Sequence, residues 1–519
     1  MLARHGKVNP YIVMWLAVAI GVGFLTYAPP ATGEVLEKAL EKICEYQFQD
    51  GVTIKVHFTD QILKRSQASA YFPKEVLDAA VSAYQTIIEF QGFSTPGYSF
   101  ASPDKNYAYD PDRTIDIYLG HPEEPTAYLH QGVGNVSFKD APCFDTVKVS
   151  EKQYQAVILL PANYQEFIKN WEKINPSPLG TRNLTVDLRG TLIHEMLHVI
   201  LFYYNKNLNK DPQVEAAGTD ELPRSKRIDW YVEGLARYFE TLAGARHDFF
   251  SQGFKETLPD KIRFSRGGSN YFMRYPDQAF VDLRYENALF WRFIDYRYGM
   301  PVIEKLSRDL RRFPRFDFKE ALEKATGASF SELLKTFAQS ILFRDFGLKE
   351  DEAYLKDIAK TRLLYQDRGL YLVDGWDNKK LLGHRCQTDW IGRWDVARAG
   401  FGEFSVAGDS TEKSDVSGWA TDFYEIDMAS DTPSLPWLGV YQKGPKDLLA
   451  VQVFIVTRGG SVLKRQAVKV TASQSYNGLA LQDEIKKVGL EAKDIEKIYL
   501  LITNTDPKLL VDYGVVLHP

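Results

Sequence analysis

The sequence predicts an α+β protein that ends in an all-β domain. Three observations support this: helix and strand patterns alternate over residues 34–187, helical patterns dominate 188–348, and short alternating runs follow over 369–519. A chain of 519 residues is too long for one ordinary core, so several domains are expected. The net charge of -5 argues against nucleic acid as a partner, because phosphate-binding surfaces carry a basic excess.

Residues 1–33 are predicted to be a signal peptide or an N-terminal membrane anchor. Arg4 and Lys7 precede an apolar run at 11–28 that is just long enough to cross about 30 Å of hydrocarbon. A cleaved signal peptide and membrane attachment through residues 11–28 both remain open. Either one predicts an extracytoplasmic protein, secreted or membrane-anchored by its N-terminus.

Export makes the three cysteines, Cys44, Cys143 and Cys386, candidates for disulfide formation. Cys44 and Cys143 could pair and leave Cys386 free. Three buried thiols are the alternative, and the sequence does not separate the two.

Residues 34–187 are expected to form the α/β N-terminal lobe of a catalytic domain. Amphipathic spacing predicts helices over 34–48 and 74–90. Strand patterns cover "VTIKVHF" at 52–58, "TIDIYL" at 114–119 and "QAVILL" at 155–160.

Residues 188–348 are expected to form a helical lobe, followed by a linker at 349–368 and a β-sandwich at 369–519. The predicted helices are 188–205, 229–244, 286–299, 301–313 and 329–343. The main predicted strands are 421–428, 449–456, 466–472, 497–503 and 511–517. The sandwich carries no catalytic signature and is interpreted as an accessory domain. Its tryptophans, Trp376, Trp390, Trp394 and Trp437, either dock protein or glycan or fill the core.

The stretch "TLIHEMLHVI" contains an HExxH motif on a predicted helix. Positions four apart lie on one helix face, so His194 and His198 can bind a single Zn²⁺. Glu195, one residue round the helix, can then act as the general base toward a water activated by the metal. A buried helix that happens to contain these residues is the competing interpretation.

A catalytic zinc needs a third protein ligand, and "DWYVEGLARYFE" supplies Glu233 on the next strongly helical segment. The intervening stretch is polar and contains Gly and Pro, so the second helix can return against the first. A carboxylate among Trp230, Tyr231, Val232 and Leu235 is costly to bury without a partner, and a cation removes that cost. A solvated helix face is the alternative for Glu233.

"HEMLH" followed by "WYVEGLARYFE" resembles the gluzincin metallopeptidases, the superfamily of thermolysin and aminopeptidase N. The resemblance implies a zincin-like domain in which His194, His198 and Glu233 bind zinc and Glu195 is the base. It also implies that "QAVILL" is the edge strand that binds extended substrate. Tyr285 matches the position of the tyrosine that serves as oxyanion donor in the aminopeptidase N branch, with Tyr275 as a rival and His247 as a weaker candidate. An ordinary packing tyrosine is the alternative.

Two departures from the superfamily are evident. No G-x-M-E-N signature precedes His194, so trimming of peptides from a free amino terminus is unsupported. Arg237 occupies the position four residues after Glu233, where thermolysin has an aspartate that orients a histidine ligand. Another acceptor is therefore expected, with Asp187, Asp229 and Glu240 as candidates.

The favoured function is that of an exported zinc metallopeptidase, an endopeptidase acting on peptide or protein substrate. A different hydrolase on the same scaffold is one alternative. A non-catalytic, zinc-stabilised cell-surface binding or adhesion protein is another, although a structural zinc site needs no base such as Glu195.

Overall fold

The computed structural model is mixed α+β, as the sequence predicts. Within 1–347 it describes 42–93, 113–121, 142–148, 154–174, 184–204, 228–243, 281, 287–312, 315–343 and 345–347. Further along it describes 370–376, 395–396, 404–406, 415–416, 419–428, 434–435, 437–442, 448–465, 471–472, 478–506 and 511–518. The predicted signal or anchor at 1–33, the linker at 349–368 and Cys386 lie outside these residues. Among the described residues, no helix combines the length and apolar character needed to span a bilayer.

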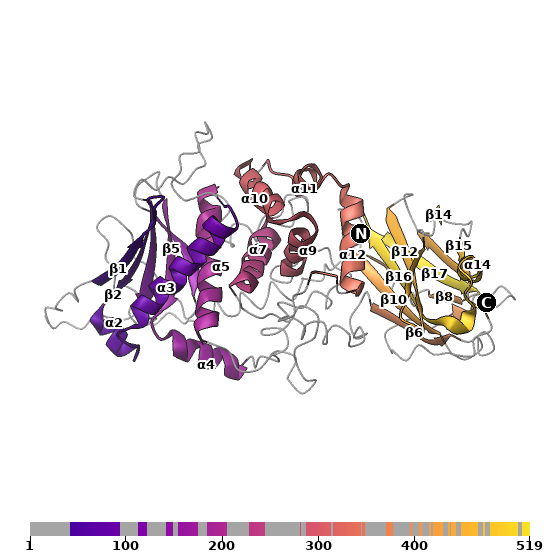
Figure 1. Cartoon of the computed structure of the whole chain (residues 1–519), viewed down its shortest axis with the longest axis horizontal. Helices are drawn as coiled ribbons and strands as arrows, with labels where there is room; N and C mark the ends of the chain where they lie inside the picture. Colours follow the sequence, from indigo (N-terminus) through magenta and orange to yellow (C-terminus); the bar gives the residue numbers. More distant parts are fainter. Residues whose placement is uncertain are drawn as a thin grey trace, which may run out of the picture. The chain divides into compact units, whose positions relative to one another are not determined.

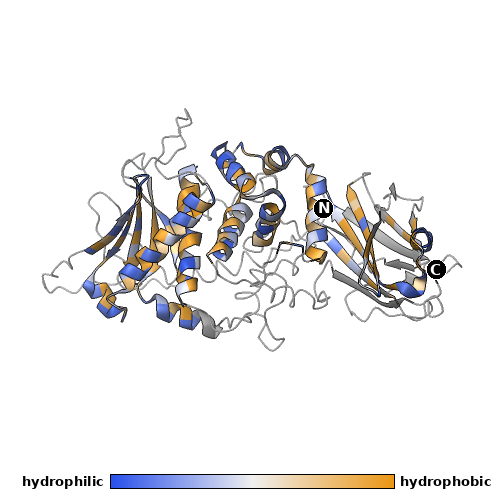
Figure 2. Ribbon diagram, viewed as in Figure 1, coloured by the Kyte–Doolittle hydropathy of each residue, from blue (hydrophilic) through white to orange (hydrophobic). Residues whose placement is uncertain are grey.

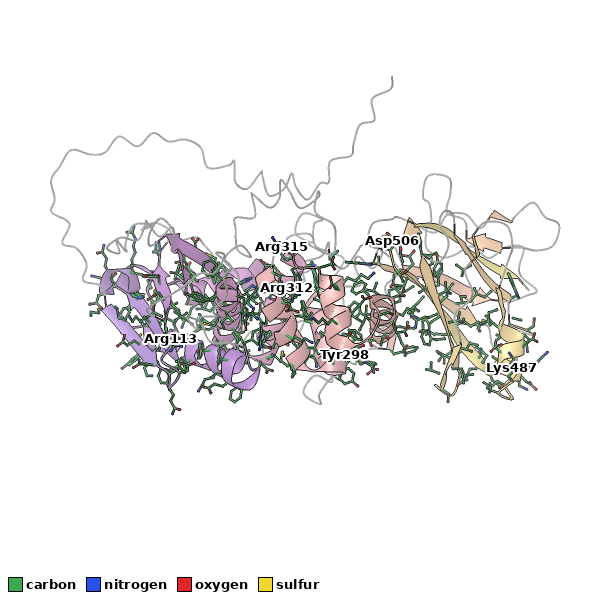
Figure 3. All side chains as sticks on the ribbon, turned by 90° about the horizontal axis from the view of Figure 1, so that it is seen from above. Arg113, Tyr298, Arg312, Arg315, Lys487 and Asp506 are labelled. Carbon is green, nitrogen blue, oxygen red and sulfur yellow. The ribbon has the colours of Figure 1, made fainter. Side chains whose placement is uncertain are left out.

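The N-terminal lobe contains a five-stranded mixed sheet. Its strands are β1 (Lys42–Gln47), β2 (Thr53–Phe58), β3 (Thr114–Gly120), β4 (Cys143–Lys148) and β5 (Tyr154–Pro161). The strand order is β1-β2-β3-β5-β4, with β2, β3 and β5 parallel and with β1 and β4 antiparallel at the two ends. Arg113, labelled in Figure 3, precedes β3 and donates from Nη1 to the carbonyl of Asp50 before β2.

Two long helices, α3 (Phe72–Tyr84) and α5 (Leu184–Tyr204), lie over one face of this sheet (Figure 1). α3 continues as a π-helix over Gln85–Phe90, and two shorter helices are α2 (Asp60–Arg65) and α4 (Tyr164–Ile174). Alternate residues of the strands, such as Ile54, Val56 and Ile117, are completely buried. Apolar residues recur along both the strands and the helices (Figure 2), as expected for layers that share a core.

The helical lobe continues from α5 with five further α-helices among the described residues: α7 (Asp229–Leu242), α9 (Ala288–Tyr298), α10 (Met300–Asp309), α11 (Phe318–Thr326) and α12 (Phe330–Phe343). A 3₁₀ turn, Leu310–Arg312, extends α10. Gly299 joins α9 to α10 with φ of 84°, a conformation that favours glycine. The rings of Trp230 and Trp291 stack 5.6 Å apart between α7 and α9, and both are fully buried.

The C-terminal region contains two sheets. One, ordered β13-β12-β16-β10-β6, consists of β13 (Val462–Arg465), β12 (Leu449–Thr457), β16 (Ile495–Asn504), β10 (Thr421–Met428) and β6 (Leu370–Trp376). The other, ordered β14-β11-β17-β8-β7, consists of β14 (Thr471–Ala472), β11 (Trp437–Gln442), β17 (Val511–His518), β8 (Phe404–Val406) and β7 (Asp395–Val396). β15 (Gly478–Ala480) pairs with β11, and β9 (Asp415–Val416) pairs with β17. α14 (Leu481–Lys486) and a 3₁₀ turn, Ala492–Asp494, precede β16. Residues of both sheets, including Leu438, Val453 and Leu500, share one apolar core.

The structure corrects the predicted helix over 34–48. Residues Lys42–Gln47 form β1 and pair antiparallel with β2. The helical spacing is genuine, but the open edge of β2 offers backbone partners that are remote in sequence, and tertiary pairing outweighs local preference. Residues 34–41 lie outside the described part of the chain.

The structure also corrects the edge-strand prediction. "QAVILL" lies in β5, between β3 and β4, and β4 is the strand at that end of the sheet. A continuous apolar run is typical of a strand covered on both faces, whereas β4, "CFDTVK", mixes polar and apolar residues.

The Cys44–Cys143 pairing is contradicted, since neither cysteine forms a disulfide. Cys44 lies on β1 and Cys143 on β4, the two end strands, with three strands between them. Burial raises the pKa of Cys44, which makes its thiolate less accessible.

Candidate metal centre

The helix α5 presents the two histidines of the HExxH motif on one side. The ring centroids of His194 and His198 are 4.8 Å apart, and both residues are buried. Their neighbours Ile193 and Leu197 have no exposed surface, so packing fixes the helix that carries them. The apolar residues of "TLIHEMLHVI" are thus the support of the histidine pair.

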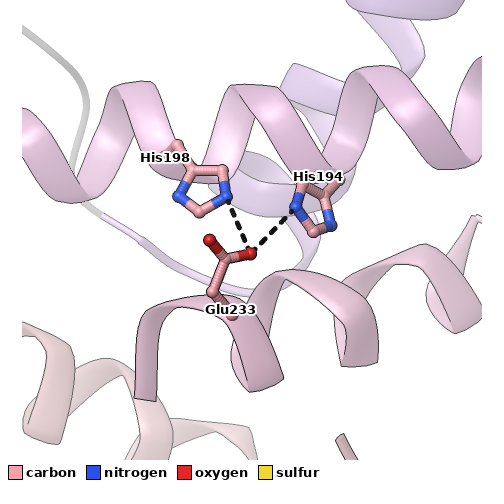
Figure 4. Close-up of side chains that lie close together, drawn as sticks. All are labelled: His194, His198 and Glu233. Atoms are coloured by element: carbon pink, nitrogen blue, oxygen red, sulfur yellow. Dashed lines mark ion pairs between the residues drawn. The ribbon is translucent and has the colours of Figure 1, made fainter. Parts of the chain in front are cut away.

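Glu233 reaches this pair from α7. Its Oε2 atom lies 3.6 Å from Nε2 of His194 and 3.8 Å from Nε2 of His198 (Figure 4). The three side chains offer ligand atoms that all lie within 4.8 Å of one another. The structure therefore brings together the three residues that the sequence singles out from two separate helices.

The spacing of these atoms fits one tetrahedral ion. Both nitrogen–oxygen separations are longer than a good hydrogen bond. Two ligand atoms about 2.0–2.1 Å from a shared zinc ion would lie roughly 3.3 Å apart, so small side-chain adjustments suffice. Two imidazoles and one carboxylate are a donor set that suits zinc and leaves a fourth position open.

A second carboxylate holds His194 from the other side of its ring. Nδ1 of His194 lies 2.7 Å from Oε1 of Glu240, in the last turn of α7. Nη1 of Arg237 donates to the other oxygen of the same carboxylate at 2.8 Å. Of the three acceptors considered from the sequence, Glu240 is thus the partner of His194. Asp187 lies in the first turn of α5 and Asp229 begins α7.

Glu195 is buried beside the histidines and contacts the sheet. The pKa of Glu195 is raised to about 7, chiefly by burial and also by the nearby carboxylates of Glu233 and Glu240. The positive charge of His194 and a hydrogen bond from the backbone of Phe144 act in the opposite direction. A carboxyl with a pKa near neutrality can both accept and release a proton, which suits acid–base catalysis.

Phe144 was not singled out from the sequence. It lies on β4, its ring centroid is 6.1 Å from that of His198, and its backbone contacts Glu195. The end strand of the sheet therefore borders the site. In the sequence, the apolar run of "QAVILL" is interrupted on its N-terminal side. That interruption is the signal that could have indicated a separate outer strand.

The tyrosine and histidine candidates for an oxyanion donor are not placed. Tyr285, Tyr275 and His247 all lie outside the described residues, so their roles stay predictions.

No protein-family model matches the chain, and no curated protein is significantly similar to it in sequence.

Proposed function

We propose that this protein is an exported zinc metallopeptidase that hydrolyses internal peptide bonds. The observation that carries the proposal is the convergence of His194, His198 and Glu233 beside a buried Glu195. A base next to three ligands favours a catalytic site, because a structural zinc site needs ligands alone and closes its fourth position.

Each side chain has a distinct role in the proposed reaction. His194, His198 and Glu233 hold the ion, and zinc when bound would supply Lewis-acid polarisation. Glu195 accepts a proton from the attacking water and returns it to the leaving amine. The hydrogen bond from Phe144 keeps the Glu195 carboxylate in place for this transfer. Tyr285, by resemblance, donates to the developing oxyanion.

The position of β4 supports a peptide as substrate. In an antiparallel pair, successive residues point their backbone groups alternately toward the partner strand and away from it. The N–H of Phe144 bonds to Glu195, so it faces away from β5. An extended peptide aligned along this side of β4 would pass beside Glu195 and His198.

The proposal extends to the architecture of the two domains. The five-stranded sheet with α3 and α5 is interpreted as the upper part of a zincin-like domain, and the two C-terminal sheets as a β-sandwich accessory domain. The accessory domain would dock protein or glycan, and the N-terminal segment would direct the protein out of the cytoplasm.

Metal analysis of the purified soluble part, combined with digestion of a peptide library, tests the proposal. We expect one zinc per chain and internal cleavage that stops on chelation and returns with added zinc. Glu195→Gln serves as the matched inactive control. Zinc without cleavage would overturn the peptidase proposal in favour of a binding protein, and absence of zinc would overturn the metal site as well.

A further inference from the structure

The contacts of Glu240 show which residue orients His194 in this protein. Arg237 occupies the position where the resemblance leads one to expect a carboxylate that orients a histidine. The acceptor comes instead from one turn further along α7, where Glu240 contacts His194 through Oε1 and Arg237 through Oε2. One carboxylate thus joins a histidine from α5 to an arginine from its own helix.

We infer that Arg237 and Glu240 form a positioning pair that selects the tautomer of His194 needed to bind a metal. The inference rests on the proposed metal site. Arg237 has no acceptor atoms, so its contact with Glu240 must be a donation to the carboxylate. The remaining oxygen of Glu240 then faces Nδ1 of His194 and accepts a hydrogen bond from its N–H. When the ring gives up one proton to bind a metal, Nε2, which faces Glu233, is then the nitrogen that is left with a lone pair.

The burial of these three side chains makes the choice of tautomer energetically important. The side chains of His194 and Glu240 are each 10% exposed and that of Arg237 is 21% exposed. A buried carboxylate without a positive partner is costly, so the guanidinium also stabilises Glu240 in its charged, accepting form. The pair thereby gives His194 an acceptor while adding no net charge to the centre.

The substitution Glu240→Gln tests this because an amide offers one accepting atom where the carboxylate offers two. With Arg237 present, the amide must turn its NH₂ group toward one of two donors. If the NH₂ group faces Arg237, the amide and the guanidinium are two donors that repel each other. If the NH₂ group faces His194, Nδ1 must accept a hydrogen bond, and the ring proton then lies on Nε2, where it blocks the metal.

Competition with a chromophoric chelator would measure zinc affinity in wild type, Glu240→Gln, Arg237→Met and the double variant. We expect Glu240→Gln to lose about 10–100-fold in affinity. The double variant should recover most of that loss, because the amide oxygen is then free to accept from His194. Arg237→Met alone should bind more tightly than Glu240→Gln, since the carboxylate remains. Thermal melting of the metal-free proteins would verify folding.

A second arginine–glutamate pair, away from the histidines, provides a control. On α10 the side chain of Glu304 is 11% exposed and that of Arg308 is 46% exposed, and Nε of Arg308 donates to Oε1 of Glu304 at 3.0 Å. Glu304→Gln, with and without Arg308→Met, should change stability but not zinc affinity.

Two results would overturn the positioning pair: Glu240→Gln that binds zinc like wild type, or a double variant no better than Glu240→Gln. A wild-type protein that binds zinc but cleaves no peptide would overturn the peptidase proposal alone, and rescue in the double variant would still support the pair. A wild-type protein that binds no zinc would overturn both.

Discussion

The backbone of Phe144 donates a hydrogen bond to the carboxylate of Glu195. This contact joins the end strand of the sheet to the helix that carries both histidines. The proposed base is therefore held from two elements, and its proton affinity responds to both burial and neighbouring charges.

Glu195→Gln should retain zinc and fold while turnover falls by about 10²–10⁴-fold, the usual contribution of a positioned general base. Glutamine keeps the size and the hydrogen-bond acceptor but cannot take a proton at neutral pH. Steady-state hydrolysis of a cleaved peptide, with metal content measured on the same samples, provides the test. Full activity in this variant would remove the general-base role.

Glu233→Ala should release or strongly weaken the zinc, because it removes the ligand that α7 supplies to the proposed site. Glu304→Ala removes another largely buried carboxylate from the helical lobe and serves as the control. Metal analysis after dialysis should separate the two variants. Unchanged zinc stoichiometry in Glu233→Ala would exclude Glu233 as third ligand.

Tyr285→Phe should reduce turnover with little change in metal content, because it removes a hydroxyl donor and leaves the ligands intact. Tyr275→Phe is the matched comparison for the rival position. Comparing kcat and KM for both variants would assign the role. If neither substitution changes kcat, both tyrosines return to ordinary packing roles.

The part of the site that could be predicted from the sequence depends on local geometry. The spacing of His194 and His198 places both on one helix face whatever the rest of the chain does. The apolar neighbours of Glu233 favour a buried carboxylate with a partner over a solvated one, and the histidine pair is an available partner. The structure brings these three residues together.

The remaining features depend on contacts that are remote in sequence. Lys42–Gln47 has helical spacing but pairs with β2, and β4 takes the edge that was assigned to "QAVILL". Local patterns carry little information on such pairing, since it depends on which strand edges are free. Glu240 could be named only as one of three acceptors, because the rotation of α7 against α5 decides which carboxylate meets His194.

The stacked pair Trp230–Trp291 should anchor the helix that carries Glu233. Trp291→Ala is expected to lower the free energy of unfolding by about 3–5 kcal/mol, as for other large buried aromatics. Trp291→Phe should lower the free energy of unfolding by less, because a ring remains in contact with Tyr231. The ring centroids of Tyr231 and Trp291 are 4.4 Å apart. Chemical denaturation of the metal-free proteins measures both. Equal stability of Trp291→Ala and wild type would show that this stack contributes little.

Zinc binding should release a proton at alkaline pH. Burial lowers the pKa of His194, but its interactions with Glu233 and Glu240 outweigh this and raise it to about 10 in the metal-free protein. Ligation requires the neutral ring, so at pH 8 the ion must displace that proton. The apparent association constant should therefore rise by about tenfold per pH unit between pH 7 and pH 10.

The same shift has the opposite effect on the metal-free fold. A folded-state pKa above the unfolded value stabilises the protein fully below the unfolded pKa of 6.5, and this contribution is lost as pH rises through about 10. Zinc and protons thus compete for His194, and the metal should stabilise the fold most at the alkaline end. Calorimetric titration at pH 8 in two buffers of different ionisation enthalpy would count the released protons. A count of zero would mean that His194 is already neutral before the metal arrives, so Glu233 and Glu240 would not hold a proton there.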